Sequence, residues 1–342
     1  MQLAVRPPFR SLWRWGGGSL LEFPPAIGYG RLYVATNNGR LVAVNARTGK
    51  HAWQYRSHRC VAASPALDDG LVFQTFMNHP PCNARGGRGL DGEVAAFAVG
   101  FGHLKWKRTI GPTETSPLVA NGLVYVGDWR GDVYALAEHT GKTRWRFHTR
   151  GPVKGGVALS DNRVYVGSYD GHLYCLNART GKLIWRAHAQ PRLGHSGQFY
   201  ATPAVAYGRV YVGATDGKMY SFGATTGKLR WSHHTGGYVY SSAAVWRETV
   251  YVGSYDGHVY AFDAATGDVR WRFKTNGPIS GAITVIGGVV YAATLKRRTY
   301  ALATRNGKLL WQFRDGKYTP VVADRRRLYL VGYARIYGMA PR

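Results

Sequence analysis

The sequence predicts an all-β chain that folds as an eight-bladed β-propeller of four-stranded antiparallel blades. Its clearest repeat reads VYVGSYDGHLYCLNARTGKLIW at residues 164–185 and VYVGSYDGHVYAFDAATGDVRW at residues 250–271. Each copy contains three runs of β-branched and aromatic residues, which are typical of strands. Asp170-Gly171 and Thr180-Gly181-Lys182 separate the runs, and both sequences favour tight turns. Such a unit cannot bury its own faces, so the copies are expected to pack on one another.

The repeat occurs eight times, and the two ends of the chain complete it together. The tyrosine-valine strand has eight registers, at Tyr33, Phe73, Tyr125, Tyr165, Tyr211, Tyr251, Tyr291 and Tyr329. The tryptophan of the last strand recurs at Trp53, Trp106, Trp145, Trp185, Trp231, Trp271 and Trp311. The eighth unit lacks this tryptophan, but residues 10–13 (RSLW) resemble residues 308–311 (KLLW). We expect residues 10–15 to close the ring and residues 22–342 to supply eight repeats, within one domain spanning 1–342.

The innermost strands and the long loops follow from the same alignment. Small residues precede each tyrosine-valine strand, as in Ser64-Pro65-Ala66 and Thr202-Pro203-Ala204, and they suit a crowded strand beside a central channel. Insertions lengthen the segment 77–92, inside the second blade, and the segment 188–200, between the fourth and fifth blades. In an up-and-down blade both connections leave the same face, here called the top face. Insertions confined to one face often mark a binding surface.

The charge of the chain is strongly basic. Lys and Arg total 45 against 18 Asp and Glu, giving a net charge of +27, and 33 of the basic residues are arginine. This charge favours an anionic partner such as nucleic acid, a membrane surface or an acidic polymer. Much of it, however, recurs at equivalent turn positions, namely Lys50, Lys142, Lys182, Lys228 and Lys308. We therefore interpret the charge as spread around a monomer, expect no specific nucleic-acid binding, and note that peripheral membrane association fits it.

No apolar segment approaches the roughly 18 residues that a spanning helix needs, and almost no helix of any kind is expected. The start of the chain, MQLAVRPPFRSLWRW, lacks the apolar region of a signal peptide. The sequence therefore leaves two alternatives: a cytoplasmic protein, or an export segment or anchor outside this chain.

The three cysteines have different interpretations. Cys60 begins the inner strand of the second blade and Cys82 lies in its top insertion, so a disulfide is geometrically reasonable, and the alternative is two free thiols. A disulfide would pin the insertion and favour an oxidising, extracytoplasmic compartment such as the periplasm or the cell surface. Cys175 takes the place of Ala135 and Ala261 in other blades and is expected to be a small buried hydrophobe.

Enzyme and metal signatures are absent from the sequence. No zinc spacing, GxSxG, Walker or HExxH motif occurs, and the adjacent pair His233-His234 would point to opposite faces of a strand. Of the five glutamates, we expect only Glu114 to stand in a loop that leads to an inner strand. The repeated Asp170, Asp216 and Asp256 are interpreted as turn formers. We therefore expect no catalytic residue, no metal site and no cofactor.

The top-face loops carry aromatic and cationic residues that suit stacking and the pairing of carboxylates or phosphates. Lys296-Arg297-Arg298 also replaces the usual Asp-Gly turn of the seventh blade, where a solvated turn is the alternative interpretation. The residues expected to form this partner-binding surface are Arg59, Trp129, Arg130, Lys154, Tyr169, Phe199, Tyr200, Tyr238, Tyr240, Tyr255, Lys296, Arg297, Arg298, Lys317 and Tyr318.

The pattern VYVGS-DG-LYAL-TGK-W resembles the repeat of the pyrroloquinoline-quinone-like propeller family, over about residues 22–342. The resemblance implies that each fourth-strand tryptophan docks on the neighbouring blade. Members of this family include quinoprotein dehydrogenases, the propeller lipoprotein of outer-membrane β-barrel assembly, and extracellular sensor or scaffold domains. The dehydrogenases imply a vicinal-cysteine disulfide, a Ca²⁺ held by Glu and Asn, and a catalytic Asp. Here Cys60, Cys82 and Cys175 are far apart in sequence, and carboxylates are scarce.

The sequence thus favours a non-catalytic propeller that binds a protein partner or an anionic cell-envelope polymer through its top-face loops. Two alternatives belong to other classes. One is a pyrroloquinoline-quinone-dependent alcohol or sugar dehydrogenase, with Glu114 as the first catalytic suspect. The other is a sensor domain whose transmembrane partner lies outside this chain.

Overall fold

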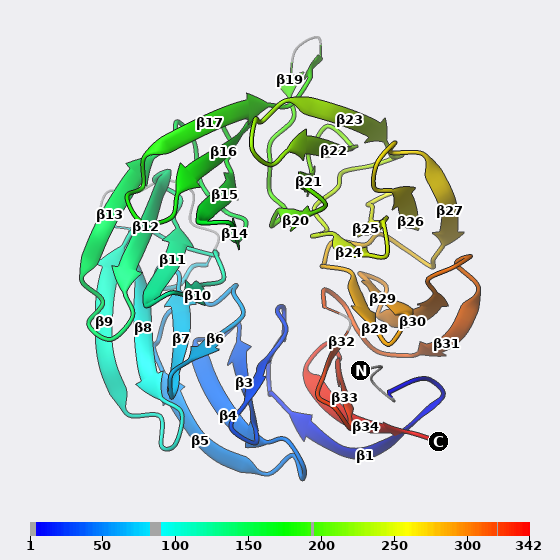
Figure 1. Ribbon diagram of the computed structural model, residues 1–342. Helices are drawn as coiled ribbons and strands as arrows, with labels where there is room; N and C mark the ends of the chain where they lie inside the picture. The colour runs from blue at the N-terminus through cyan, green and yellow to red at the C-terminus, as the bar shows by residue number, and fades with distance from the viewer. Residues whose placement is uncertain (1–4, 83–89, 193–194, 320) are drawn as a thin grey trace.

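The computed structural model describes residues 5–82, 90–192, 195–319 and 321–342. Parts of both insertions, 83–89 and 193–194, together with Pro320 of a predicted inner segment, lie outside the described residues. Eight antiparallel four-stranded sheets are arranged in a ring (Figure 1), which confirms the predicted eight-bladed propeller. The described part of the chain contains no helix, and therefore no helix that could span a membrane.

The first four blades follow one another along the chain, with the innermost strand first. Blade 1 contains β2 (Ala26–Gly28), β3 (Arg31–Thr36), β4 (Arg40–Asn45) and β5 (His51–Arg56). Blade 2 contains β6 (Ala66–Asp68), β7 (Leu71–Phe76), β8 (Gly92–Ala98) and β9 (Leu104–Ile110). Blade 3 contains β10 (Leu118–Ala120), β11 (Leu123–Gly127), β12 (Asp132–Ala137) and β13 (Thr143–His148). Blade 4 contains β14 (Ala158–Ser160), β15 (Arg163–Gly167), β16 (His172–Asn177) and β17 (Leu183–His188).

The next three blades repeat this order after a small hairpin, β18 (Pro191–Arg192) and β19 (His195–Ser196), which projects beyond the perimeter in Figure 1. Blade 5 contains β20 (Ala204–Ala206), β21 (Arg209–Gly213), β22 (Lys218–Gly223) and β23 (Leu229–His234). Blade 6 contains β24 (Ala244–Trp246), β25 (Thr249–Gly253), β26 (His258–Asp263) and β27 (Val269–Lys274). Blade 7 contains β28 (Thr284–Ile286), β29 (Val289–Thr294), β30 (Arg298–Ala303) and β31 (Leu309–Phe313).

The last blade joins the two ends of the chain. It contains β32 (Val321–Ala323), β33 (Leu328–Val331), β34 (Arg335–Pro341) and, as its outermost strand, β1 (Phe9–Gly16). The two terminal strands are antiparallel, with Phe9 opposite Pro341 and Gly16 opposite Arg335. Figure 1 shows the two terminal strands, β1 and β34, side by side in this blade. The prediction that residues 10–15 close the ring is confirmed.

The core lies between the blades, and its most regular element is the tyrosine of each second strand. Seven such tyrosines and Phe73 are at most 2% exposed. In five joints between blades the tyrosine hydroxyl and the fourth-strand indole donate to one carbonyl of the next blade. At the joint between blades 3 and 4, for example, Tyr125 Oη lies 3.2 Å and Trp145 Nε1 2.8 Å from the carbonyl oxygen of Ala178. One buried acceptor is thereby satisfied twice by the preceding blade.

A glycine in the next blade's turn allows the indole to approach that closely. Gly181 has φ of +70°, and a Cβ at this position would collide with the Trp145 ring. The same clash would arise between each equivalent turn glycine and the tryptophan of the blade before it. The Thr-Gly-Lys turn was predicted only as a turn, but its glycine is also half of the joint between blades.

The joint between blades 7 and 8 is different, because the last blade has no Thr-Gly-Lys turn. Trp311 instead meets the edge of the Phe9 ring, with centroids 5.3 Å apart. The buried hydroxyl of Tyr291 has no hydrogen-bond partner among the described residues. The strand contributed by the N-terminal segment thus replaces a polar joint with an aromatic contact.

Two further sets of hydrogen bonds join neighbouring blades, one beside the central channel and one at the top face. Hydroxyls at the starts of inner strands accept hydrogen bonds from the preceding blade, as when Ser116 Oγ accepts from the Ser64 amide at 2.9 Å. The repeated aspartates are turn formers, as predicted. Asp170 accepts from the amide of His172, from the amide of Arg150 in the previous blade and from the hydroxyl of Tyr174.

The shared carbonyl predicts a non-additive double-mutant cycle. We expect Tyr125→Phe to cost under about 1 kcal/mol and Trp145→Phe about 1–2 kcal/mol, because each variant leaves one donor on the Ala178 carbonyl. The double variant should cost about 1–3 kcal/mol more than their sum, since the buried carbonyl then has no donor. Urea unfolding of the four proteins provides the measurement.

Blade 2 offers a natural control, because Phe73 stands where the other blades carry tyrosine. Among the residues that the structure describes, Trp106 Nε1 is the one side-chain donor to the Glu138 carbonyl. Trp106→Phe alone should therefore cost about 1–3 kcal/mol more than Trp145→Phe. Equal costs for these two variants, together with an additive cycle, would contradict the role assigned to the shared acceptor.

Candidate binding site at the channel mouth

A cavity of about 360 Å³ opens at the top of the central channel, and every blade contributes to its wall. Most of the lining consists of small residues at the starts of the inner strands, with polar and aromatic side chains above them. The lining residues are Glu22, Phe23, Pro24, Ser64, Glu114, Ser116, Lys154, Gly155, Gly156, Tyr200, Thr202, Tyr240, Ser242, Ser280, Gly281, Ala282, Tyr318 and Thr319. The cavity is of a size that holds a small molecule or one or two side chains of a partner.

Glu114, in the loop between β9 and β10, is the fixed carboxylate of this mouth. Its Oε1 accepts from Trp129 Nε1 at 3.0 Å and lies 3.1 Å from Lys154 Nζ. Burial raises the pKa of Glu114, while Lys154 and the Trp129 indole oppose that shift by favouring the carboxylate. Lys154 is held further by aromatic faces, 4.5 Å from the Trp129 ring and 5.2 Å from the Tyr169 ring.

Glu22 is a second carboxyl group at the mouth, so the expectation that only Glu114 stands in such a loop was wrong. Burial raises the pKa of Glu22 from its ordinary 4.5 to about 7; Glu114 adds to the rise and Lys317 opposes it. Alignment could have found it: Glu22 precedes Ala26, the start of β2, by the same four positions that separate Glu114 from Leu118, the start of β10.

A cluster of tyrosines continues the wall over blades 4 to 6. The Tyr200 and Tyr240 ring centroids lie 5.0 Å apart, and Tyr255 lies 5.1 Å from Tyr240. Tyr169 and Tyr238 extend the cluster on either side, at 6.2 Å from Tyr200 and 5.7 Å from Tyr240. Burial raises the pKa of Tyr200 well above 10, whereas Tyr238 is 52% exposed. The structure therefore brings these five predicted residues together as one aromatic surface, half open to solvent.

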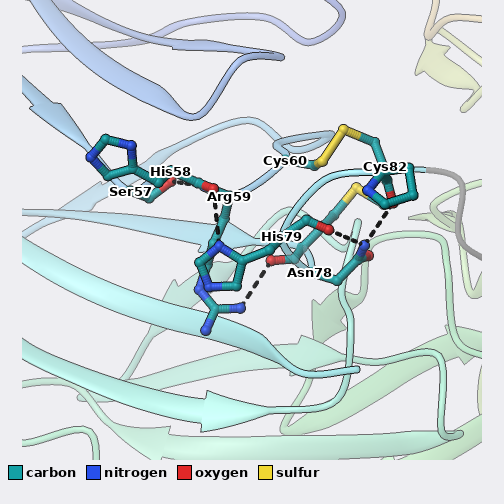
Figure 2. Close-up of a disulfide and its surroundings, with 9 residues drawn as sticks. Ser57, His58, Arg59, Cys60, Asn78, His79 and Cys82 are labelled. Atoms are coloured by element: carbon teal, nitrogen blue, oxygen red, sulfur yellow. Dashed lines mark hydrogen bonds between the residues drawn. A yellow bond between two sulfur atoms is a disulfide. The ribbon is translucent and has the colours of Figure 1, made fainter. Parts of the chain in front are cut away.

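Cys60 and Cys82 form the predicted disulfide beside the mouth (Figure 2), with their Cα atoms 5.5 Å apart. The surrounding backbone is paired as well: the Cys60 amide donates to the Asn78 carbonyl, and the Met77 amide donates to the Cys60 carbonyl. The Asn78 side chain donates to the carbonyls of His79 and Pro81. The disulfide thus ties the start of the insertion to the loop after β5.

The disulfide also lines a second cavity, of about 310 Å³, that adjoins the channel mouth. Glu22, Glu114 and Lys154 border both cavities, and Trp129 borders the second. Both carboxyl groups therefore stand in the wall between the channel and the corner that the disulfide stiffens.

Three of the predicted cationic residues are engaged in structural contacts. Arg59 is only 12% exposed in its side chain, pairs with Asp91 at 2.9 Å and donates to the Met77 carbonyl. Arg130 donates to the carbonyl of Leu90 at 2.7 Å. Arg298 begins β30 and donates to Gln312 on the outer strand, away from the channel. Arg59 and Arg130 thus border the second-blade insertion rather than the mouth.

The remaining cations form a separate corner over blades 7 and 8. Arg297 and Lys317 both lie against the Tyr333 ring, at 4.7 Å and 5.1 Å, and Lys317 also lies 5.0 Å from the Tyr318 ring. Arg297 takes the positive φ, 58°, that glycine adopts in the other turns. Lys296 is exposed beside it. This corner contains Lys296, Arg297 and Lys317 and is called the Lys296–Lys317 corner. It borders the mouth through Tyr318.

Two sequence interpretations concern buried residues. Phe199 was expected on the top face, but it is fully buried against Tyr220 and Phe222, so that expectation was wrong. Its place directly before Tyr200 on an extended segment turns it to the opposite side.

Cys175 is fully buried, as expected, and burial raises the pKa of its thiol to about 12. Within the described ranges no three His, Cys, Asp or Glu residues gather as metal ligands.

The comparisons with known proteins agree with this architecture. The family model described as outer membrane protein assembly factor BamB matches residues 10–136, 129–243 and 234–335. Outer membrane protein assembly factor BamB of Burkholderia pseudomallei is 30% identical over 137 residues, which are 40% of this chain and 32% of that protein. The chain thus matches only about a third of the length of this relative.

Two solved structures share the fold. BamB from Moraxella catarrhalis has a TM-score of 0.81 and 18% identity, covering 97% of this chain and 100% of that one. Quinohemoprotein alcohol dehydrogenase from Comamonas testosteroni has a TM-score of 0.78 and 14% identity, covering 97% of this chain and 76% of that one. At these identities the likeness shows the propeller fold alone.

The raised pKa of Glu22 predicts a pH-dependent stability. The folded protein keeps a proton that the unfolded chain releases between about pH 4.5 and 7, so folding becomes less favourable as the pH rises through that window. We expect Glu22→Gln to increase the free energy of unfolding at pH 8 by about 3 kcal/mol and to leave it nearly unchanged at pH 4. Urea unfolding at the two pH values tests this, with Glu248→Gln, at an exposed turn between β24 and β25, as the matched control.

The disulfide gives an independent prediction. Cys60→Ala/Cys82→Ala should lose about 3 kcal/mol, because the crosslink closes a loop with a sequence separation of 22. Reductant should lower the melting temperature of the wild type and leave that of the double variant unchanged. Cys175→Ala should keep the response to reductant. Alkylation of the denatured wild type without prior reduction provides a direct check. Modification of all three cysteines would show that the disulfide is absent.

Proposed function

The chain belongs to the family described as outer membrane protein assembly factor BamB, and from that premise we propose that it is a non-catalytic scaffold binding a protein partner through its top face. The observation that carries the proposal is the channel mouth, where aromatic rings and charged groups from several blades converge on one cavity. Exposed aromatic anchors beside charged groups are typical of protein-binding hot spots.

The physical character of the mouth fits a protein segment. Tyr238 and its neighbours offer large, rigid surfaces at little cost in side-chain entropy, and the cavity beside them can take an inserted side chain. Lys154 and Glu114 neutralise each other at 3.1 Å, so the mouth itself lacks the excess positive charge of the whole chain. An anionic envelope polymer remains the alternative ligand of this face, with the Lys296–Lys317 corner as its cationic contact.

We also propose that the protein works outside the cytoplasm. The Cys60–Cys82 disulfide supports this location, because such bonds persist in oxidising compartments. The name of the family supports it too, since it refers to the assembly of outer membrane protein.

Site-specific photocrosslinking tests the proposed surface. A benzoylphenylalanine in place of Tyr238, activated in living cells, should give one discrete crosslinked protein. The same residue in place of Phe101 should give none, although Phe101 is 78% exposed, because its turn between β8 and β9 leaves the opposite face. Crosslinks from position 101 alone would contradict the proposal. Saturable binding of pyrroloquinoline quinone with Ca²⁺ and dye-linked alcohol oxidation, abolished by Glu114→Gln, would favour the dehydrogenase alternative.

A further inference from the structure

The outermost strands of the propeller are basic in every blade except blade 7, where β31 contains no Lys or Arg. The eight strands β1, β5, β9, β13, β17, β23, β27 and β31 form the perimeter in Figure 1. They contain no Asp or Glu. Their Lys and Arg side chains are all exposed, and we call this set the rim belt: Arg10, Arg14, Arg56, Lys105, Lys107, Arg108, Arg144, Arg146, Arg186, Arg230, Arg270, Arg272 and Lys274.

Few of these charges are neutralised by the protein. Lys107 pairs with Glu93, Arg146 with Asp132 and Arg270 with Asp263, and all three acidic partners belong to third strands. The other members of the rim belt have no ion pair within the described part of the chain. The belt therefore differs from the channel mouth, where Lys154 already holds Glu114.

We propose that the rim belt binds a flexible linear phosphate polymer, which follows the perimeter and contacts several consecutive blades. This surface is distinct from the top face, and the inference goes beyond the proposed function. Arginine predominates in the belt, and its planar fork matches phosphate oxygens with two hydrogen bonds. A polymer gains affinity from each additional cation that it contacts, because each contact releases counterions.

The closed ring explains why the partner must be flexible. The outermost strands follow a closed ring (Figure 1), and seven of the eight carry belt residues, so a planar membrane can touch only a few neighbouring blades at once. The tryptophans of these strands point inward, and those of blades 3 to 6 are at most 9% exposed. The belt thus lacks the open aromatic rings on which the bases of single-stranded nucleic acid stack. A chain of repeated phosphates, recognised by its charge alone, therefore fits the rim belt.

Binding of long-chain inorganic polyphosphate, followed by fluorescence anisotropy, tests the proposal. Affinity should rise with chain length from orthophosphate to tripolyphosphate to the long polymer. Raising the salt from 50 to 200 mM should weaken binding of the long chain by at least about 100-fold, as expected when six or more phosphates are contacted. Affinity independent of length would overturn the wrapping geometry.

Two charge variants with the same change in net charge locate the site. R144E/R186E/R230E/R272E reverses unpaired belt residues on blades 3 to 6, and R130E/K296E/R297E/K317E reverses top-face cations. The belt variant should lose about 100-fold in affinity and the top-face variant less than about 3-fold, since only the first removes phosphate contacts. Equal losses would show that binding follows net charge and would overturn the proposal.

Two further arms separate the sources of phosphate. Oligothymidylate should compete with polyphosphate, because the two share repeated phosphates; binding of oligothymidylate alone would overturn the proposal in favour of nucleic acid. Tighter binding to phosphatidylglycerol vesicles than to polyphosphate would overturn it in favour of a membrane. Circular dichroism checks the folding of each variant. Should charge reversal prevent folding, the neutral variant R144Q/R186Q/R230Q/R272Q carries the same prediction with a smaller loss of about 10-fold.

Discussion

The contact between the indole of one blade and the glycine turn of the next is the constraint on which the ring depends. At the joint between blades 3 and 4, Trp145 rests on Gly181 and shares the Ala178 carbonyl with Tyr125. The contact combines burial of a large aromatic surface with the satisfaction of a buried polar group, and each needs the other. Because the contact between indole and turn glycine recurs at every joint except the one between blades 7 and 8, where Trp311 meets Phe9, it fixes the orientation of each of these blades relative to its neighbour.

This joint lies at the turns between third and fourth strands. The loops of the opposite face, the top face, take no part in these contacts between tryptophan and glycine. The loops of the top face can therefore hold groups that are costly to bury. Glu22, with a pKa raised to about 7, and Glu114, held by Lys154 and Trp129, stand together at the channel mouth. Buried carboxyl groups in a cavity at the centre of a rigid scaffold are common where proteins bind ligands, because strain and desolvation are tolerated there.

Charge is divided between three regions with different roles. The mouth pairs its cations with carboxylates, the Lys296–Lys317 corner holds its cations against aromatic rings, and the rim belt leaves most of its arginines unpaired. A net charge of +27 therefore does not describe a uniformly basic surface. The division suits a scaffold that could engage a protein at its top face and a polyanion around its edge.

The sequence by itself determined the fold, because a propeller is a sum of local repeats. Turn glycines, alternating strands and the recurring tryptophan identify the blades, and the spare RSLW segment identifies the closing strand. Cys60 and Cys82 were also predictable, since the repeat places both at the same corner. Tertiary structure decided which side chains meet: it assigned Arg59 to Asp91, buried Phe199 in the core, gathered five tyrosines beside the channel and brought Glu22 to Glu114. These outcomes depend on side chains that separate loops bring together, mostly within one blade or between neighbouring blades, and no local pattern records which of them meet.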